Sequence, residues 1–168
     1  MKKKLTVEGL IEEAKLFCDK VSNFHSRELY GVTDGKAVGT NIEHMFQRIL
    51  KEKYFYTAGS AARGIDFPDH HINTDIKVTS IVQPQSSCPF RDARQKIYGL
   101  GYNLLLFVYE KIDEPKTQTA NLNFKSCSFI AKERTGDYQT TKSILQMMDN
   151  DSNTDDITAY LSCRRNNS

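Results

Sequence analysis

A run of six apolar residues from Leu104 to Tyr109 constrains the fold of this chain more than any other feature. A short, continuous apolar run is typical of a strand buried on both faces, because a half-buried strand alternates apolar with polar residues. Helical apolar spacing occurs at 6–24, at 41–53 and from Phe90 to Gly99. Helices that cover a buried strand predict an α/β fold with a mixed central sheet flanked by helices.

The remaining patterns complete this expected organisation. Thr6 is a predicted cap of the first helix, 31–39 a loop, 54–57 the start of the sheet, and 123–131 a further strand. Helices are expected at 140–148 and 155–161, with a flexible linker at 149–153. We expect one domain over 1–168, with its core at about 40–111, an N-terminal helix and loop over 1–39, and a flexible or truncated C-terminal part over 149–168.

Composition restricts the compartment and the partners. The 168 residues carry 23 basic and 21 acidic side chains, so a net charge of +2 provides no strong general attraction to nucleic acid. Binding to DNA would therefore depend on a local patch. No signal peptide or transmembrane run is recognisable, and the four cysteines are too widely spaced for a zinc motif, so we expect a cytoplasmic protein with no membrane partner.

The triplet Asp75-Ile76-Lys77 lies in the alternating segment 74–80 and is the strongest functional signal. Side chains i and i+2 of a strand point the same way, so Asp75 and Lys77 share one face. The same alternation places Asp66 opposite its neighbours in the segment 64–67, and the short connection 68–73 predicts a hairpin between the two segments. Two carboxylates and an amine then converge.

Such a group suits metal-dependent hydrolysis of a phosphodiester. Paired carboxylates hold Mg²⁺, for which Mn²⁺ can substitute, and the ion neutralises phosphoryl charge and supplies a nucleophilic water. Lys77 is positioned to orient or deprotonate that water. The chain contains three more acid-x-Lys triplets, at 13–15, 34–36 and 114–116, but none lies on a predicted strand next to a second acid. A solvated strand face with an ion pair is the alternative interpretation.

These residues resemble the PD-(D/E)XK nuclease superfamily, and most closely its type II restriction endonucleases, over roughly residues 40–111. The resemblance implies a helix that carries a glutamate, followed by the hairpin and then a further helix and strand. Glu43 matches that glutamate as a catalytic or metal-binding acid, and Asp66, Asp75 and Lys77 match the rest. It implies a prokaryotic, Mg²⁺-dependent enzyme that cleaves double-stranded DNA at a specific sequence. Cutting both strands with one site per chain is simplest for a homodimer.

Two assignments stay open at this level. The family's Pro-Asp dipeptide occurs literally at Pro68-Asp69, but Asp69 falls in the expected turn, so we favour Asp66 as the first acid. Glu43 stands three residues after Thr40 and is equally expected to act as the glutamate of a helix capping box.

A polar segment after the triplet is the best candidate for DNA contact. Glutamine, arginine and lysine side chains read base edges or grip phosphates, although a solvated helix face is an alternative. The candidates are Gln83, Gln85, Ser86, Ser87, Arg91, Arg94 and Lys96. Two other functions remain: a DNA repair or structure-specific nuclease, and a non-catalytic DNA-binding protein.

Overall fold

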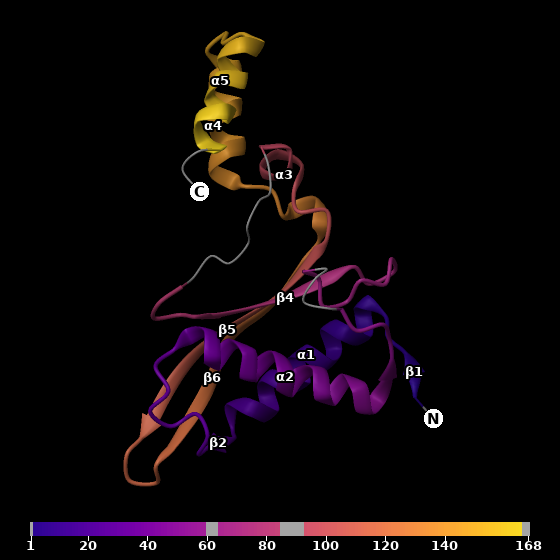
Figure 1. Ribbon diagram of the computed structural model, residues 1–168, viewed down its shortest axis with the longest axis vertical. Helices are drawn as coiled ribbons and strands as arrows, with labels where there is room; N and C mark the ends of the chain where they lie inside the picture. The colour runs from indigo at the N-terminus through magenta and orange to yellow at the C-terminus, as the bar shows by residue number, and fades with distance from the viewer. Residues whose placement is uncertain (1, 60–63, 85–92, 166–168) are drawn as a thin grey trace. The chain divides into compact units, whose positions relative to one another are not determined.

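The computed structural model describes residues 2–59, 64–84 and 93–165 (Figure 1). The chain forms two compact units. The first comprises residues 1–87 and 104–129, and the second comprises residues 88–103 and 130–168.

A four-stranded sheet organises the first unit, with the strand order β2-β6-β5-β4. Its strands are β2 (His25–Ser26), β4 (Thr74–Ser80), β5 (Asn103–Glu114) and β6 (Thr119–Ile130). The apolar run 104–109 lies within β5, between β6 and β4, and Leu105 and Phe107 are fully buried. The predicted α/β class and the central position of this strand are confirmed.

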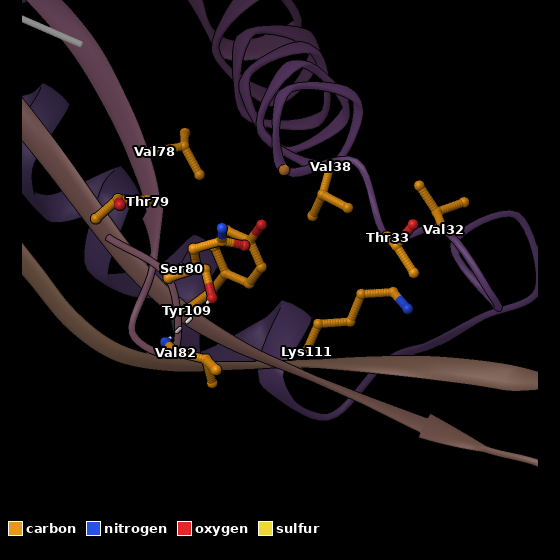
Figure 2. A pocket seen from close by; sticks show the side chains of 11 residues that line it. Val32, Thr33, Val38, Val78, Thr79, Ser80, Val82, Tyr109 and Lys111 are labelled. Carbon is orange, nitrogen blue, oxygen red and sulfur yellow. Dashed lines mark hydrogen bonds between the residues drawn. The ribbon is translucent and has the colours of Figure 1, made fainter. Parts of the chain in front are cut away.

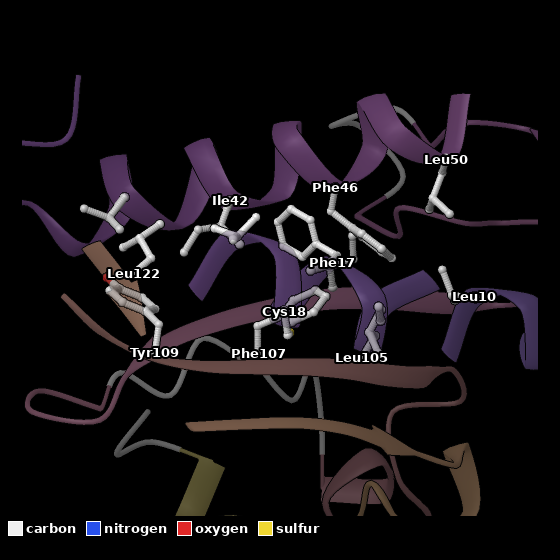
Figure 3. Close-up of a cluster of buried hydrophobic side chains, with 14 of the residues drawn as sticks. Leu10, Phe17, Cys18, Ile42, Phe46, Leu50, Leu105, Phe107, Tyr109 and Leu122 are labelled. Carbon is white, nitrogen blue, oxygen red and sulfur yellow. The ribbon is translucent and has the colours of Figure 1, made fainter. Parts of the chain in front are cut away.

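Helices α1 (Val7–Ser22) and α2 (Gly35–Lys53) pack over this sheet and close the core (Figure 3). The ring of Phe17 on α1 lies 5.2 Å from that of Phe46 on α2, and Phe46 lies 5.3 Å from Phe107 on β5. Phe124 on β6 completes the cluster, 5.8 Å from Phe107. Tilted and edge-on ring contacts of this kind add to the free energy of apolar burial.

The first helix begins where its sequence predicts, because the Thr6 hydroxyl accepts the Gly9 N–H at 3.1 Å. The start of the second helix was predicted wrongly. Residues 35–39, expected in a loop, belong to α2, whose cap is Asp34, accepting the Lys36 N–H at 2.9 Å. The buried stripe of α2 begins at Val38, so packing against the core favours the earlier start.

The predicted hairpin exists only in part. Segment 64–67 makes one antiparallel bridge, in which Phe67 and Thr74 exchange hydrogen bonds of 3.0 and 3.1 Å. The expected strand at 64–67 is therefore wrong, although the two segments do meet. Pro68 lacks an N–H, and the Asp69 carbonyl accepts the N–H groups of Ile72 and Asn73 at 2.8 and 2.7 Å, so a tight turn replaces a longer ladder.

Residues 54–57 do not begin the main sheet, which corrects another expectation. Instead β3 (Tyr54–Phe55) pairs in parallel with β1 (Lys3–Lys4) in a separate two-stranded sheet. Phe55 is 63% exposed and its ring lies 5.7 Å below the Lys2 ammonium. An exposed side chain of this kind fits a surface ribbon better than a buried sheet.

The second unit is mainly helical, with α3 (Ala93–Tyr98), a 3₁₀ turn η1 (Lys132–Arg134), α4 (Tyr138–Asp149) and α5 (Thr154–Arg165). Gly99 ends α3 as predicted, with a φ of 90° that favours glycine. The expected flexible linker at 149–153 is a compact turn, in which the Ser152 N–H donates to Met147 at 2.9 Å and Asn153 accepts the Asp155 N–H at 2.8 Å. Within the described ranges, no helix combines the length and apolar character needed to cross a membrane.

Candidate active site

A pocket of about 400 Å³ forms in the first unit where α2, segment 64–66 and β4 meet. It contains the three acids and the one amine that the sequence analysis selected as catalytic candidates. Its lining residues are Glu43, His44, Gln47, Gly59, Gly64, Ile65, Asp66, Asp75, Ile76 and Lys77.

Asp66 is held at both carboxylate oxygens. Its Oδ2 accepts the backbone N–H of Ile76 at 2.8 Å, and its Oδ1 accepts the side-chain amide of Gln47 at 3.1 Å. Its backbone carbonyl accepts the Gly59 N–H at 2.7 Å. A Cβ at position 59 would lie 1.8 Å from the Ile65 carbonyl oxygen, so only glycine permits this approach. The segment that presents Asp66 is thus fixed by backbone contacts.

The environment of Asp66 favours its protonated form. Burial, opposed by the hydrogen bond from Ile76 and reinforced by the Asp75 and Glu43 carboxylates, raises the pKa of Asp66 to about 7. The Asp66 carboxyl group therefore titrates near neutral pH. A cation placed between these carboxylates would favour the ionised form.

Asp75 and Lys77 share the pocket face, as the alternation along the strand predicts. The Lys77 ammonium lies 2.8 Å from Asp75 Oδ2, with the lysine side chain 24% exposed and the aspartate side chain 6% exposed. This contact is an ion pair without hydrogen-bond alignment, because Asp75 Oδ2 is buried and accepts no hydrogen bond from the described residues. A buried oxygen in this state retains a lone pair for a further ligand.

Glu43 enters from α2 and is half-buried. Burial raises the pKa of the Glu43 carboxyl, Lys77 lowers it, and Asp75 raises it further. The helix cap is Asp34, nine positions earlier, so the capping interpretation of Glu43 is wrong. Glu43 therefore has no helix-capping role and faces the charged groups of the pocket.

The donor set fits a hard divalent cation. Asp66 and Asp75 supply carboxylate oxygens, and Asp75 Oδ2, which the Lys77 ammonium contacts without a hydrogen bond, is an atom that a cation would coordinate. In the part of the chain that the structure describes, no group of three or more His, Cys, Asp or Glu side chains is arranged to hold a metal. Two carboxylates suit Mg²⁺, which keeps several waters and binds through one or two protein carboxylates.

The alternative first acid lies elsewhere. The Asp69 carboxylate accepts the Thr57 N–H at 2.9 Å, which lowers the pKa of Asp69, and this residue does not line the pocket. Its geometry is that of a turn residue. Of the two candidates, Asp66 is the one that the structure brings beside Asp75 and Lys77.

The predicted DNA-contact residues are described only in part. Gln83 is exposed in the first unit, and in the second unit Arg94 is exposed and Lys96 half-buried. The other candidates, Gln85, Ser86, Ser87 and Arg91, lie outside the described residues.

Two lining residues were missed by sequence reasoning. Gln47 holds Asp66, and His44 lines the pocket from an exposed position on α2. Gln47 follows Glu43 by four residues, so the shared helix face was an available signal. The sequence gives no comparable signal for His44, which adjoins Glu43 on the helix.

Comparison with known proteins shows the family of this chain. A family model described as "Type II restriction enzyme NspV" matches residues 4–167. This chain belongs to the NspV family of type II restriction enzymes. A curated relative, the type II restriction enzyme NspV of Nostoc sp. (strain ATCC 29411 / PCC 7524), is 52% identical over 160 residues, covering 95% of this chain and 72% of the relative. No solved structure matches the chain significantly. Membership of the NspV family confirms the predicted relationship to type II restriction endonucleases.

Proposed function

We propose that this protein is a Mg²⁺-dependent endonuclease that hydrolyses phosphodiester bonds of double-stranded DNA at a specific sequence. The observation that carries the proposal is the convergence of Asp66, Asp75 and Lys77 in one pocket with Glu43 on its wall. The NspV relative, named a type II restriction enzyme, supports the same reaction.

Asp66 and Asp75 would hold the cation, and Mn²⁺ would substitute for Mg²⁺. When bound, this ion neutralises charge on the phosphoryl group and lowers the pKa of a coordinated water. Asp66 is presented in a fixed orientation by Gln47 and Ile76, so little reorganisation is needed for it to bind. Asp75 contributes the oxygen that accepts no hydrogen bond from the described residues.

Lys77 orients the attacking water and stabilises negative charge on the phosphate as that charge develops. Its ion pair with Asp75 fixes the ammonium at the floor of the pocket. Glu43 positions a second water from the opposite wall, or accepts a proton from it, since burial raises the pKa of its carboxyl towards the operating range of a general base.

DNA contacts are assigned in this proposal to the polar segment and helix after β4. The residues are Gln83, Gln85, Ser86, Ser87, Arg91, Arg94 and Lys96. The active form is a homodimer in the prokaryotic cytoplasm, with one catalytic pocket for each DNA strand.

Digestion of unmodified phage DNA tests the reaction. With Mg²⁺ we expect discrete bands, with Mn²⁺ the same bands, and with a chelator none. End sequencing of the fragments then gives the target and the cut position. Cleavage that requires a mismatch or junction would indicate a repair nuclease instead, and salt-sensitive binding without cleavage by folded protein would indicate a non-catalytic DNA-binding protein.

A further inference from the structure

A second pocket lies beside the candidate active site, in the same unit and between the same elements, α2 and β4 (Figure 2). Its volume of about 330 Å³ is at the small end of the range for small-molecule sites, about 300–1,000 Å³. Its lining residues are Val32, Thr33, Gly35, Val38, Val78, Thr79, Ser80, Val82, Gln83, Tyr109 and Lys111. No role in the proposed hydrolysis uses this pocket.

The walls are apolar on several sides. Figure 2 shows Val38 and Val78 from α2 and β4, with Val32 and Val82 from the adjoining segments. Branched aliphatic side chains in the lining offer apolar contact to a ligand.

The charge of the lining argues against a phosphate. Lys111 supplies the positive charge among the described lining residues, but its ammonium is paired with Asp113, which also accepts the Gly31 N–H at 3.2 Å. Asp34, at the start of α2, adds a negative charge near Tyr109. A neutral ligand is therefore favoured over an anion.

Polar side chains also line the pocket. Tyr109 is only 3% exposed and lines the pocket, yet its hydroxyl makes no hydrogen bond with any described residue. The side chains of Gln83 and Thr33 line the pocket from exposed positions. Burial and the nearby Asp34 raise the pKa of Tyr109, so its hydroxyl keeps a proton to donate. Because Tyr109 lines the pocket, a ligand edge that accepts from its hydroxyl would gain a hydrogen bond.

We propose that this pocket binds a nucleobase, taken from the DNA substrate by turning one nucleotide out of the helix. The assignment of DNA as its source rests on the proposed function. A nucleobase is neutral and planar, with apolar faces for the valines and a hydrogen-bonding edge for Gln83 and Tyr109. Glutamine amides pair with adenine edges, so a purine with that pattern is the expected occupant.

The distance from the catalytic group fits a nearby nucleotide. Val78 directly follows Lys77 on β4, and Val38 precedes Glu43 by five residues on α2. At about 1.5 Å per helical residue, Val38 and Glu43, which line different pockets, are separated by roughly 7–8 Å along α2. DNA advances about 3.4 Å per nucleotide along its axis, so this rise corresponds to about two nucleotide steps between the bound base and the cleaved phosphate. Unstacking costs a few kcal/mol, which contacts in the pocket offset.

Fluorescence of 2-aminopurine tests whether a base of the DNA duplex enters the pocket. This base replaces each purine in turn in a duplex that carries the mapped cleavage site, and binding is measured with Ca²⁺ in place of Mg²⁺ to prevent cutting. We expect a severalfold rise in fluorescence at one position. Tyr109→Phe, which removes only the hydroxyl, and Gln83→Leu, which removes the amide, should each reduce the rise and weaken DNA binding about threefold to tenfold, the scale of one hydrogen bond.

Tyr138→Phe is the matched control, because it deletes the same hydroxyl from an exposed side chain of the second unit. It should leave the signal and the cleavage unchanged. A second arm titrates the wild-type protein with adenosine, a riboside that carries the adenine edge, and with inorganic phosphate, and follows the Tyr109 and Val78 resonances by NMR. Shifts with the riboside that Tyr109→Phe weakens support a nucleobase pocket, and if no DNA position gains fluorescence they identify a free nucleoside as its source.

The proposal is overturned if neither the duplex nor the riboside occupies the pocket, or if phosphate shifts these resonances in preference to the riboside. In the first case, sequence-specific cleavage that persists in Tyr109→Phe would leave the proposed function intact. A protein that neither binds nor cuts DNA would instead refute the proposed function, while the riboside titration would still decide whether the pocket takes a base.

Discussion

Two aspartates with the same chemistry occupy different environments at the scale of single residues. Asp66 has a hydrogen-bond donor on each oxygen, whereas Asp75 has a buried oxygen that accepts no hydrogen bond from the described residues. The first carboxylate is therefore fixed in orientation before a cation arrives. The second has a buried oxygen that the Lys77 ammonium contacts at 2.8 Å and that a cation would also neutralise.

The first prediction concerns catalysis by residues 75 and 77. Asp75→Ala should lose a metal ligand and Lys77→Ala the aligned ammonium, so each should reduce cleavage by at least about 10²-fold. Binding measured with Ca²⁺ should weaken only modestly for Lys77→Ala, since one positive charge is lost near the phosphate. Asp75→Ala removes a negative charge, so metal-free binding should be retained or tightened.

Lys15→Ala and Lys36→Ala are the matched controls, because each alters another acid-x-Lys triplet at an exposed position. Both should cut DNA within a few fold of the wild type. Full cleavage by correctly folded Lys77→Ala protein would show that the catalytic amine lies elsewhere.

The second prediction concerns pH. The pKa of Asp66 rises from 3.8 to about 7 on folding, so between these values the folded protein holds more protons than the unfolded chain. Asp66 thus contributes stability that is present at low pH and lost as pH rises through about 7, by at most about 1.4 kcal/mol per pH unit. Urea unfolding of metal-free protein from pH 5 to 8 measures this slope. In Asp66→Asn the slope should be smaller, and an unchanged slope would contradict the raised pKa.

At the scale of elements, sequence patterns correctly predicted the features that depend on residues close together in the chain. The apolar run 104–109 gave a central strand, Thr6 gave a cap, and alternation placed Asp75 and Lys77 together. Features that depend on residues far apart in the chain were either not predicted or predicted wrongly. The 54–57 segment pairs with residues about fifty positions earlier, and the hydrogen bond from Gln47 to Asp66 also joins separate elements. No local pattern encodes such pairings.

The start of α2 is the clearest case of competition between two local signals. Asp34 and Thr40 are both good capping residues, and the burial of Val38 selects the earlier one. Our third prediction is that Asp34→Ala lowers the free energy of unfolding by about 1 kcal/mol. Thr40→Ala, an exposed change within the helix, should be neutral or slightly stabilising. Urea unfolding compares the two variants, and a larger loss for Thr40→Ala would contradict the observed helix start.

At the scale of the whole molecule, the first unit contains both the candidate active site and the proposed nucleobase pocket. Helix α2 supplies a wall to each while its apolar stripe packs on the core, and β4 supplies the other walls. A single helix and strand thus fix the spacing between chemistry and base contact. Each chain presents one such arrangement, whereas a duplex has two strands to cut.

The fourth prediction concerns how chains with one catalytic pocket each cut both strands of a duplex. A two-fold dimer on a palindromic target would place one catalytic pocket on each strand, since closed protein symmetry mirrors the symmetry of the DNA. We expect sedimentation of the protein with its mapped target in Ca²⁺ to give two chains per duplex. Supercoiled plasmid should become linear without accumulation of nicked circles. Mixing wild type with excess Lys77→Ala should then trap nicked circles, because a mixed dimer cuts one strand. A monomer on the target, with nicking unaffected by the added variant, would exclude the dimer and indicate sequential cutting by single chains.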